Sequence, residues 1–102
     1  MESYLRLQET LETILGSENV YFQPPESYKI KYPCIIYERA NIKTIKADNI
    51  GYIKKPRYTV KYIHYDPDEL NVIEALLDLP YCEHDQQYCS ENLYHDVFSL
   101  YF

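Results

Sequence analysis

One segment of the chain constrains the fold more than any other. In it, a stretch with the two-residue periodicity of a β-strand is followed directly by an acidic segment that contains a proline. Residues 57–65 read RYTVKYIHY, and β-branched and aromatic residues dominate both alternating sets, which is typical of a β-strand. The next letters are DPDE, in which Asp66 is a good helix N-cap, Pro67 suits the first helical position and Glu69 completes a capping box. The sequence therefore predicts a strand that leads directly into a capped helix over residues 67–77.

A leading helix and a closing hairpin flank this segment. Residues 2–15 place apolar side chains at helical spacing, and Gly16 supplies the left-handed residue that commonly ends a helix. Near the other end, residues 81–88 and 93–102 are rich in aromatic residues and are separated by a short polar stretch. This pattern predicts two strands joined by a tight turn.

The middle of the chain supplies the remaining strands. Residues 20–23 and 32–38 are short apolar stretches bounded by prolines, whereas residues 40–53 fit either a ragged strand or a long basic loop. Together the elements predict an α+β fold: a mixed, mainly antiparallel β-sheet of about four to five strands packed against two helices. The length of 102 residues predicts a single domain, residues 1–102.

The sequence carries no sign of a membrane or export signal. No apolar run approaches the roughly 20 residues that a membrane helix needs, so no membrane contact is expected. The first residues lack the basic and apolar regions of a signal peptide. Cys34, Cys82 and Cys89 are an odd number of cysteines, and the simplest interpretation is reduced thiols in a cytosolic setting.

The charges are strongly segregated along a chain whose formal net charge is −6. Residues 41–65 contain one acid, Asp48, whereas residues 66–102 contain many acids and no Lys or Arg. Two readings stay open: two solvated surfaces, or a head-to-tail contact between the basic patch of one subunit and the acidic patch of the next. The basic side chains of the first range are Lys43, Lys46, Lys54, Lys55, Arg57 and Lys61.

The closing hairpin gathers cysteines, histidines and aspartates, which raises the question of a metal or catalytic site. Even spacing places Cys82, His84 and Tyr88 on one strand face and Cys89 on the other, unless a bulge intervenes. That arrangement matches no zinc-ligand spacing, and no motif brings a thiol and an imidazole to an oxyanion hole. No glycine-rich loop for phosphates is present.

We therefore expect no metal, no cofactor and no enzymatic activity. The three histidines, His64, His84 and His95, are expected to lie on strand surfaces. Nucleic-acid binding is the stronger rival, because residues 43–61 interleave basic side chains with tyrosines on which bases could stack. The acidic last third and a pI near 4.9 argue against it.

The order of elements resembles the tail terminator or tail completion (head–tail joining) proteins of long-tailed bacteriophages. In that family a leading helix precedes a proline-containing aromatic strand, a strand runs into an acidic-proline turn and helix, and an aromatic hairpin closes the chain. The resemblance extends over nearly the whole chain as a pattern of elements. The matching segments are KYPCIIY (residues 31–37), RYTVKYIHYDPDEL (57–70) and NLYHDVFSLYF (92–102). More specifically, NVYFQPPE (19–26) with KYP (31–33) resembles small proteins of phages and prophages of Gram-positive bacteria that are encoded among head–tail genes.

The resemblance implies a non-enzymatic structural virion protein that forms a ring, typically a hexamer, at the interface of tail and head. Its implied partners are other copies of itself, the major tail tube protein and a head-completion or connector protein, with DNA only as passing cargo. The implied location is the tail–head neck of the virion, and the host bacterial cytoplasm during assembly. Alternatives are a stopper or other connector, a minor capsid component, or a small nucleic-acid-binding phage accessory protein.

A ring needs two different patches that meet head to tail, and the segregated charges offer such a pair. The expected subunit interface sets Lys54, Lys55 and Arg57 against acids of the last third. Excess acid could also face the lumen and repel passing DNA. The acids of the expected interface are Glu83, Asp85 and Asp96.

Overall fold

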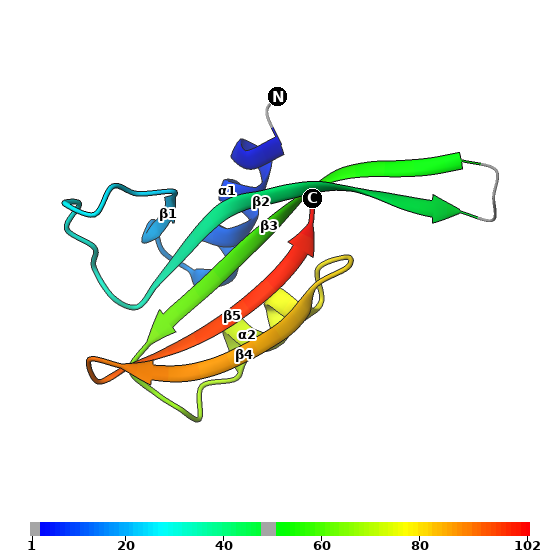
Figure 1. Cartoon of the computed structure of the whole chain (residues 1–102). Coiled ribbons are helices and arrows are strands. Elements are labelled where there is room, and N and C mark those ends of the chain that lie inside the picture. The colour runs from blue at the N-terminus through cyan, green and yellow to red at the C-terminus, as the bar shows by residue number, and fades with distance from the viewer. Residues whose placement is uncertain (1–2, 48–50) are drawn as a thin grey trace.

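A five-stranded sheet and two helices make up the computed structural model of the chain, which describes residues 3–47 and 51–102 (Figure 1). Side chains are described at residues 4–40 and 56–102. The predicted α+β class is confirmed, with strands more abundant than helices. The elements in chain order are α1 (Ser3–Leu15), β1 (Val20–Phe22), β2 (Cys34–Ala47), β3 (Gly51–His64), α2 (Asn71–Leu77), β4 (Glu83–Ser90) and β5 (Leu93–Tyr101).

The sheet has the strand order β1-β2-β3-β5-β4. β1 pairs with β2 in parallel, with Val20 opposite Ile35, and every other neighbouring pair is antiparallel. β4 and β5 form the predicted closing hairpin, whose turn residues Glu91 and Asn92 have φ of 55° and 66°. Two successive positive φ angles are the geometry of a type I′ turn, which matches the twist of a hairpin.

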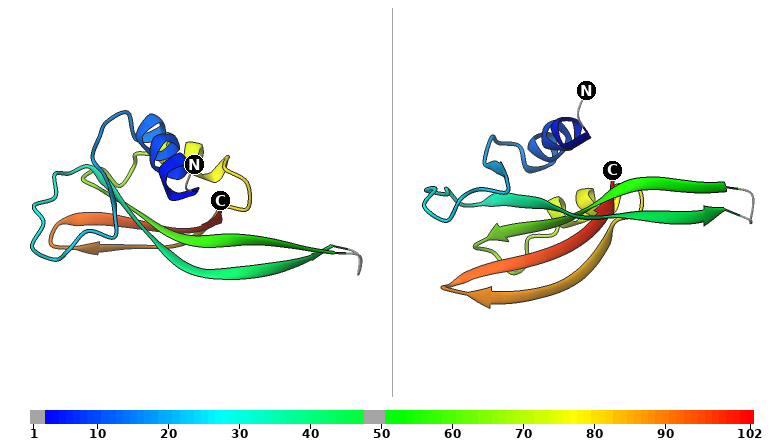
Figure 2. Two further views of the ribbon diagram at one scale, coloured as in Figure 1. Left: turned by 90° about the horizontal axis from the view of Figure 1, so that it is seen from above. Right: turned by 45° about the horizontal axis from the view of Figure 1, so that its top comes forward.

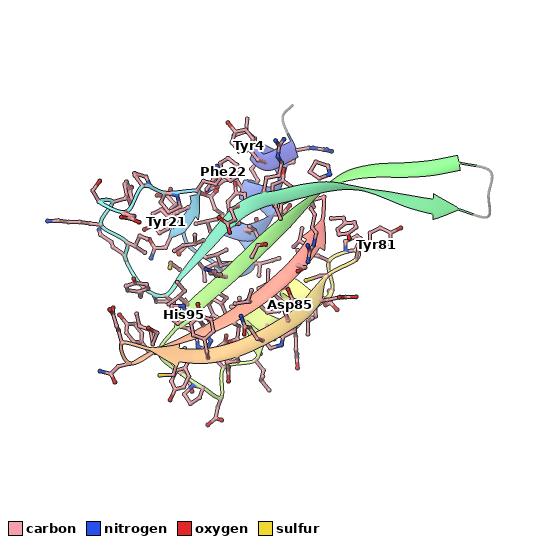
Figure 3. The ribbon with its side chains drawn as sticks, viewed as in Figure 1. Tyr4, Tyr21, Phe22, Tyr81, Asp85 and His95 are labelled. Atoms are coloured by element: carbon pink, nitrogen blue, oxygen red, sulfur yellow. The ribbon has the colours of Figure 1, made fainter. Side chains whose placement is uncertain are left out.

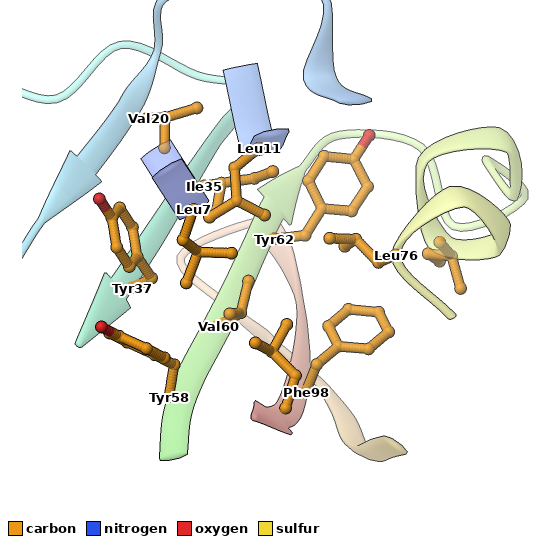
Figure 4. Packing of buried hydrophobic residues seen from close by; sticks show 12 residues of the cluster. Leu7, Leu11, Val20, Ile35, Tyr37, Tyr58, Val60, Tyr62, Leu76 and Phe98 are labelled. Atoms are coloured by element: carbon orange, nitrogen blue, oxygen red, sulfur yellow. The ribbon is translucent and has the colours of Figure 1, made fainter. Parts of the chain in front are cut away.

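Both helices cover the same face of the sheet and leave the other face open (Figure 2). The covered face holds the apolar core, in which Leu7 and Leu11 of α1 have no exposed surface (Figure 4). Burying one such side chain contributes roughly 2 kcal/mol. Gly16 ends α1 with φ of 79°, as its position predicts. The sheet and α2 contribute Ile35, Tyr37, Tyr58, Val60, Tyr62, Phe98, Leu100, Ile73 and Leu76 to this core.

Polar contacts join α1 to the sheet. The Tyr37 hydroxyl of β2 lies 2.7 Å from Gln8 Oε1, to which it can donate. Gln8 Nε2 donates to the carbonyl oxygen of Val20 in β1 at 2.9 Å. The single Gln8 side chain therefore ties the helix to both strands on that side of the sheet, which is how a buried tyrosine hydroxyl is satisfied.

β2 and β3 continue beyond the rest of the sheet as a two-stranded ribbon, defined here as residues 41–47 and 51–56 (Figure 1). β1 pairs with β2 only over residues 35–37, and β5 first pairs with β3 at Arg57, but β2 and β3 stay paired as far as Ala47 and Gly51. The strand alternative for residues 40–53 is therefore confirmed, apart from residues 48–50, which lie outside the described residues. A radius of gyration of 14.3 Å, against about 13 Å for a compact chain of this length, agrees with this extension.

The predicted capped helix at Pro67 is wrong, because α2 begins only at Asn71 and its N-cap residue, Leu70, makes no side-chain cap. The Asp66 carboxylate instead accepts the backbone N–H of Asp68 at 2.9 Å, which closes a turn ahead of the helix. Glu69 does the capping: its carboxylate accepts the N–H of Val72 at 3.2 Å and the Tyr62 hydroxyl at 2.8 Å. The strand-to-helix junction is therefore held by Glu69.

We predict that Glu69→Ala costs about 2 kcal/mol of unfolding free energy, because it removes a helix cap and leaves the hydroxyl of nearly buried Tyr62 without its acceptor. Asp66→Ala, in an exposed turn, should cost under about 0.5 kcal/mol. Urea unfolding of the two variants beside the unmodified chain measures both. A larger loss for Asp66→Ala than for Glu69→Ala would mean that Asp66 holds the junction after all.

Candidate functional site

The open face of the sheet carries a short chain of hydrogen bonds between charged residues of three strands. Arg57 of β3 donates through Nη2 to Ser99 Oγ of β5 at 3.0 Å, and the Ser99 hydroxyl donates to the Asp85 carboxylate of β4. The arrangement follows from the register, because Arg57 lies opposite Tyr101 and Ser99 lies opposite Glu83. Cross-strand neighbours on one face are within reach of long side chains.

A pocket of about 340 Å³ opens beside this chain of hydrogen bonds. Tyr81 is 55% exposed, and its ring centroid lies 6.2 Å from that of Tyr101 (Figure 3). One carboxylate, one guanidinium, one hydroxyl and two phenol rings suit contact with a charged or polar group of a partner better than chemistry on a small substrate. The lining residues are Arg57, Tyr81, Glu83, Ser99 and Tyr101.

The covered face contains a second polar group of residues, built around a buried carboxylate. Asp96 of β5 is 1% exposed. Its two oxygens accept from His64 Nε2 at 2.7 Å and from His84 Nε2 at 2.8 Å, and Gln87 Nε2 lies 3.0 and 3.1 Å from them. We call these four residues the Asp96 cluster.

The Asp96 cluster follows from the strand register. Gln87 of β4 lies directly opposite Asp96, and His64 of β3 and His84 of β4 each lie one diagonal step away on the same face. An ionised carboxylate only accepts hydrogen bonds, so both imidazoles carry a proton on Nε2. His64 also stacks on Tyr62, with ring centroids 4.3 Å apart. The cluster therefore links the three strands β3, β5 and β4 through side chains.

The Asp96 carboxyl has a pKa below its ordinary value of 3.8. Burial by itself would raise this pKa, but hydrogen bonds from His64, His84 and Gln87 stabilise the ionised form and outweigh the burial. A carboxyl with a lowered folded-state pKa adds stability at neutral pH, and that contribution disappears as the pH falls through the folded-state pKa.

The Asp96 cluster contains no thiol or hydroxyl, and the Ser99 hydroxyl beside the pocket lies between Arg57, which donates to it, and Asp85, to which it donates. Burial raises the pKa of the Cys34 thiol to about 12 and that of Cys82 to about 11, so both thiols are protonated at neutral pH. Both imidazoles of the Asp96 cluster form a hydrogen bond to the Asp96 carboxylate through Nε2. Among the described residues, no three His, Cys, Asp or Glu side chains are placed to hold a metal ion.

The structure brings together only part of the expected interface. Arg57 and Asp85 are joined through Ser99 within one chain, and Glu83 lines the same pocket. Asp96 must be removed from the expected interface, because it is buried beneath the helices and its charge is already bound. The remaining members, Lys54 and Lys55, belong to the ribbon strand β3, and their side chains lie outside the described residues.

Sequence reasoning missed the Asp96 cluster and misplaced one histidine. His64 is 2% exposed and does not lie on the surface of its strand. The sequence contained a sign of this burial, because His64 is an even number of residues from Tyr58, Val60 and Tyr62, which are also buried. The face assignment along β4 also fails, because a bulge lies between His84 and Gln86. His84 pairs opposite buried Phe98, whereas Tyr88 pairs opposite His95 on the open face.

We predict that Asp96→Asn lowers the unfolding free energy by about 2 kcal/mol at pH 7, because an amide cannot accept from both imidazoles and from Gln87. The difference from the unmodified chain should shrink as the pH falls below about 4, where protonation removes the same contribution from Asp96 itself. Urea unfolding from pH 7 to pH 3 measures this, with exposed Asp68→Asn as the matched control. A difference that stays constant over this range would contradict the assigned role of the carboxylate.

Comparison with known proteins adds no family to this geometry. No protein-family model matches the chain, and no curated protein matches it significantly. In the described part of the chain, no helix has the length and apolar character needed to cross a membrane. The features that bear on function are therefore the ribbon, the two faces of the sheet and the distribution of charge.

Proposed function

We propose that this chain is a non-enzymatic assembly subunit that contacts its neighbour through the ribbon, in a ring of the tail terminator or tail completion kind. The observation that carries the proposal is the ribbon itself. It extends past the last pairing positions of β1 and β5, so among the described strands its two strands pair only with each other, and its base is held by the Phe102 N–H, which donates to the carbonyl oxygen of Pro56 at 3.2 Å. An isolated two-stranded hairpin is marginally stable in water, and three strands or a packing partner normally stabilise it.

The charges of the ribbon strengthen the need for a partner. The register sets Lys43 opposite Lys55 and Thr44 opposite Lys54. Like charges directly across a strand pair destabilise it, so the ribbon is at its most stable against an acidic surface. The last third of the same chain is acidic and contains no Lys or Arg, and Glu83 and Glu91 of that third are exposed. A second copy therefore supplies a suitable surface, in a head-to-tail contact.

The resemblance to tail terminator or tail completion proteins suggests where in a virion this contact between subunits would occur. A tail terminator or tail completion protein closes a ring, typically a hexamer, between the major tail tube protein and a head-completion or connector protein. DNA passes through such a ring only as cargo, and a net charge of −6 opposes its retention. The proposed locations are the neck of the virion and, during assembly, the host bacterial cytoplasm. A stopper or another connector, or a minor capsid component, would use the same kind of contact.

One observation favours a second candidate, a nucleic-acid-binding accessory protein. A two-stranded β-ribbon fits the major groove of DNA, and this ribbon carries Lys43, Lys46, Lys54 and Lys55. The pI near 4.9 opposes binding to phosphates, so the assembly role is preferred.

We predict that the chain assembles at low ionic strength into a ring whose mass is a fixed multiple of 12.3 kDa, and that 1 M salt weakens it. Native mass spectrometry and negative-stain imaging measure this. Lys54→Glu with Lys55→Glu should raise the concentration needed for assembly about tenfold or more, while the monomer stays folded by circular dichroism.

The matched control is Lys29→Glu with Lys31→Glu, which makes the same change of charge at exposed positions in the loop before β2. Equal weakening by both double variants would mean that net charge, not the ribbon, governs assembly. A chain that stays monomeric at millimolar concentration contradicts the proposal. Tight, salt-sensitive binding to a DNA duplex by such a monomer would favour the second candidate.

A further inference from the structure

β4 is an edge strand whose outer side is left unprotected. It ends the strand order and pairs only with β5, and all eight of its residues are exposed. Folded proteins usually blunt such an edge with lysine, proline, a bulge, a very short strand or a covering element. β4 contains neither lysine nor proline, and its protecting features, the charged residues Glu83 and Asp85 and the bulge between His84 and Gln86, all lie in its first half. From Gln86 to Ser90 its outer backbone groups are available to another strand.

Among the described strands, the ribbon and β1 also have unpaired edges, but β1 is only three residues long and the carbonyl oxygen of its Val20 already accepts from Gln8. The outer side of β3 has no strand partner over residues 51–55, and that of β2 has none beyond residue 37. An exposed sheet edge can take an additional strand from a partner, with main-chain hydrogen bonds giving affinity and side chains giving specificity.

Charge decides which edges can meet. Antiparallel pairing of Gln86–Ser90 with the same segment of a second copy would set Asp85 opposite Glu91 at both ends, and pairing ribbon with ribbon would set lysines against lysines. Like charges oppose both symmetric pairings, whereas the ribbon paired with β4 brings its lysines near Asp85 and Glu91, the acids that flank Gln86–Ser90. The preferred contact is therefore between different surfaces of two copies, which closes into a ring if the rotation allows it.

We infer that β4 of one copy accepts the ribbon of the next copy as an additional strand of its sheet, through main-chain hydrogen bonds along Gln86–Ser90. The inference rests on the proposed assembly function and specifies which segments of two neighbouring subunits meet. It also accounts for the long exposed edge, because the bulge keeps the first residues of β4 out of register and leaves the later ones for the neighbour.

Hydrogen exchange with mass spectrometry tests the contact at backbone level. Peptides covering residues 83–90 and the ribbon should both exchange at least tenfold more slowly in the assembled protein than in the monomer at low concentration. Assembly without protection of β4 overturns the inference and leaves the proposed function standing. Absence of assembly removes both. Assembly that stops at a dimer also overturns the inference, because β4 pairing with a second β4 closes on itself.

A pair of variants at one exposed position tests whether the ribbon is the strand that pairs with β4. Gln86→Lys should raise the concentration needed for assembly about fivefold, since it sets a lysine against the lysines of the ribbon, whereas Gln86→Glu should lower it or leave it unchanged. Both variants keep the pairing with Val97, and their unfolding midpoints check that the fold is intact. Equal assembly of both variants overturns the ribbon as the strand that β4 accepts.

Discussion

The antiparallel pairing of β2 with β3 is the contact on which the rest of the structure depends. It runs from Cys34 opposite Ile63 to Ala47 opposite Gly51. Its inner part supplies the centre of the sheet, where Tyr37 and Val60 lie opposite one another beneath the helices. Its outer part is the ribbon. One pairing thus builds both the core and the segment that reaches outside it, and the pairing of the outer part continues from the packed inner part after one register shift between Arg39 and Asn41.

Most of the architecture was predictable, because it follows from local patterns. The stripe of α1, the left-handed Gly16, the short turn between β4 and β5 and the alternation of β3 each predict an element that the structure contains. The start of α2 was not predictable in the same way. Asp66 and Glu69 both look like capping residues, and the choice between them depends on Tyr62, whose hydroxyl binds the Glu69 carboxylate.

The candidate sites were less predictable than the fold, because they depend on register between distant strands. His64 and Asp96 are 32 residues apart in sequence, and only the pairing of β3 with β5 makes them diagonal neighbours. The bulge in β4 then decides that His84 joins Asp96 on the covered face. Charge counting could not distinguish Asp96 from Asp85, although one is buried and the other lies beside Arg57 on the open face.

The Asp96 cluster has a mechanical consequence for the edge of the sheet. β4 places none of its residues in the apolar core, so it is held by its backbone pairing with β5, by His84 and Gln87 on the covered face, and by the Asp85–Ser99 hydrogen bond and the stacking of Tyr88 on His95 on the open face. Because Asp96 also binds His64, one carboxylate links β4 to the central strand β3 on the covered face, and the hydrogen bonds from Arg57 through Ser99 to Asp85 form a second link on the open face. Detaching this outermost strand therefore requires breaking side-chain hydrogen bonds on both faces as well as the backbone pairing.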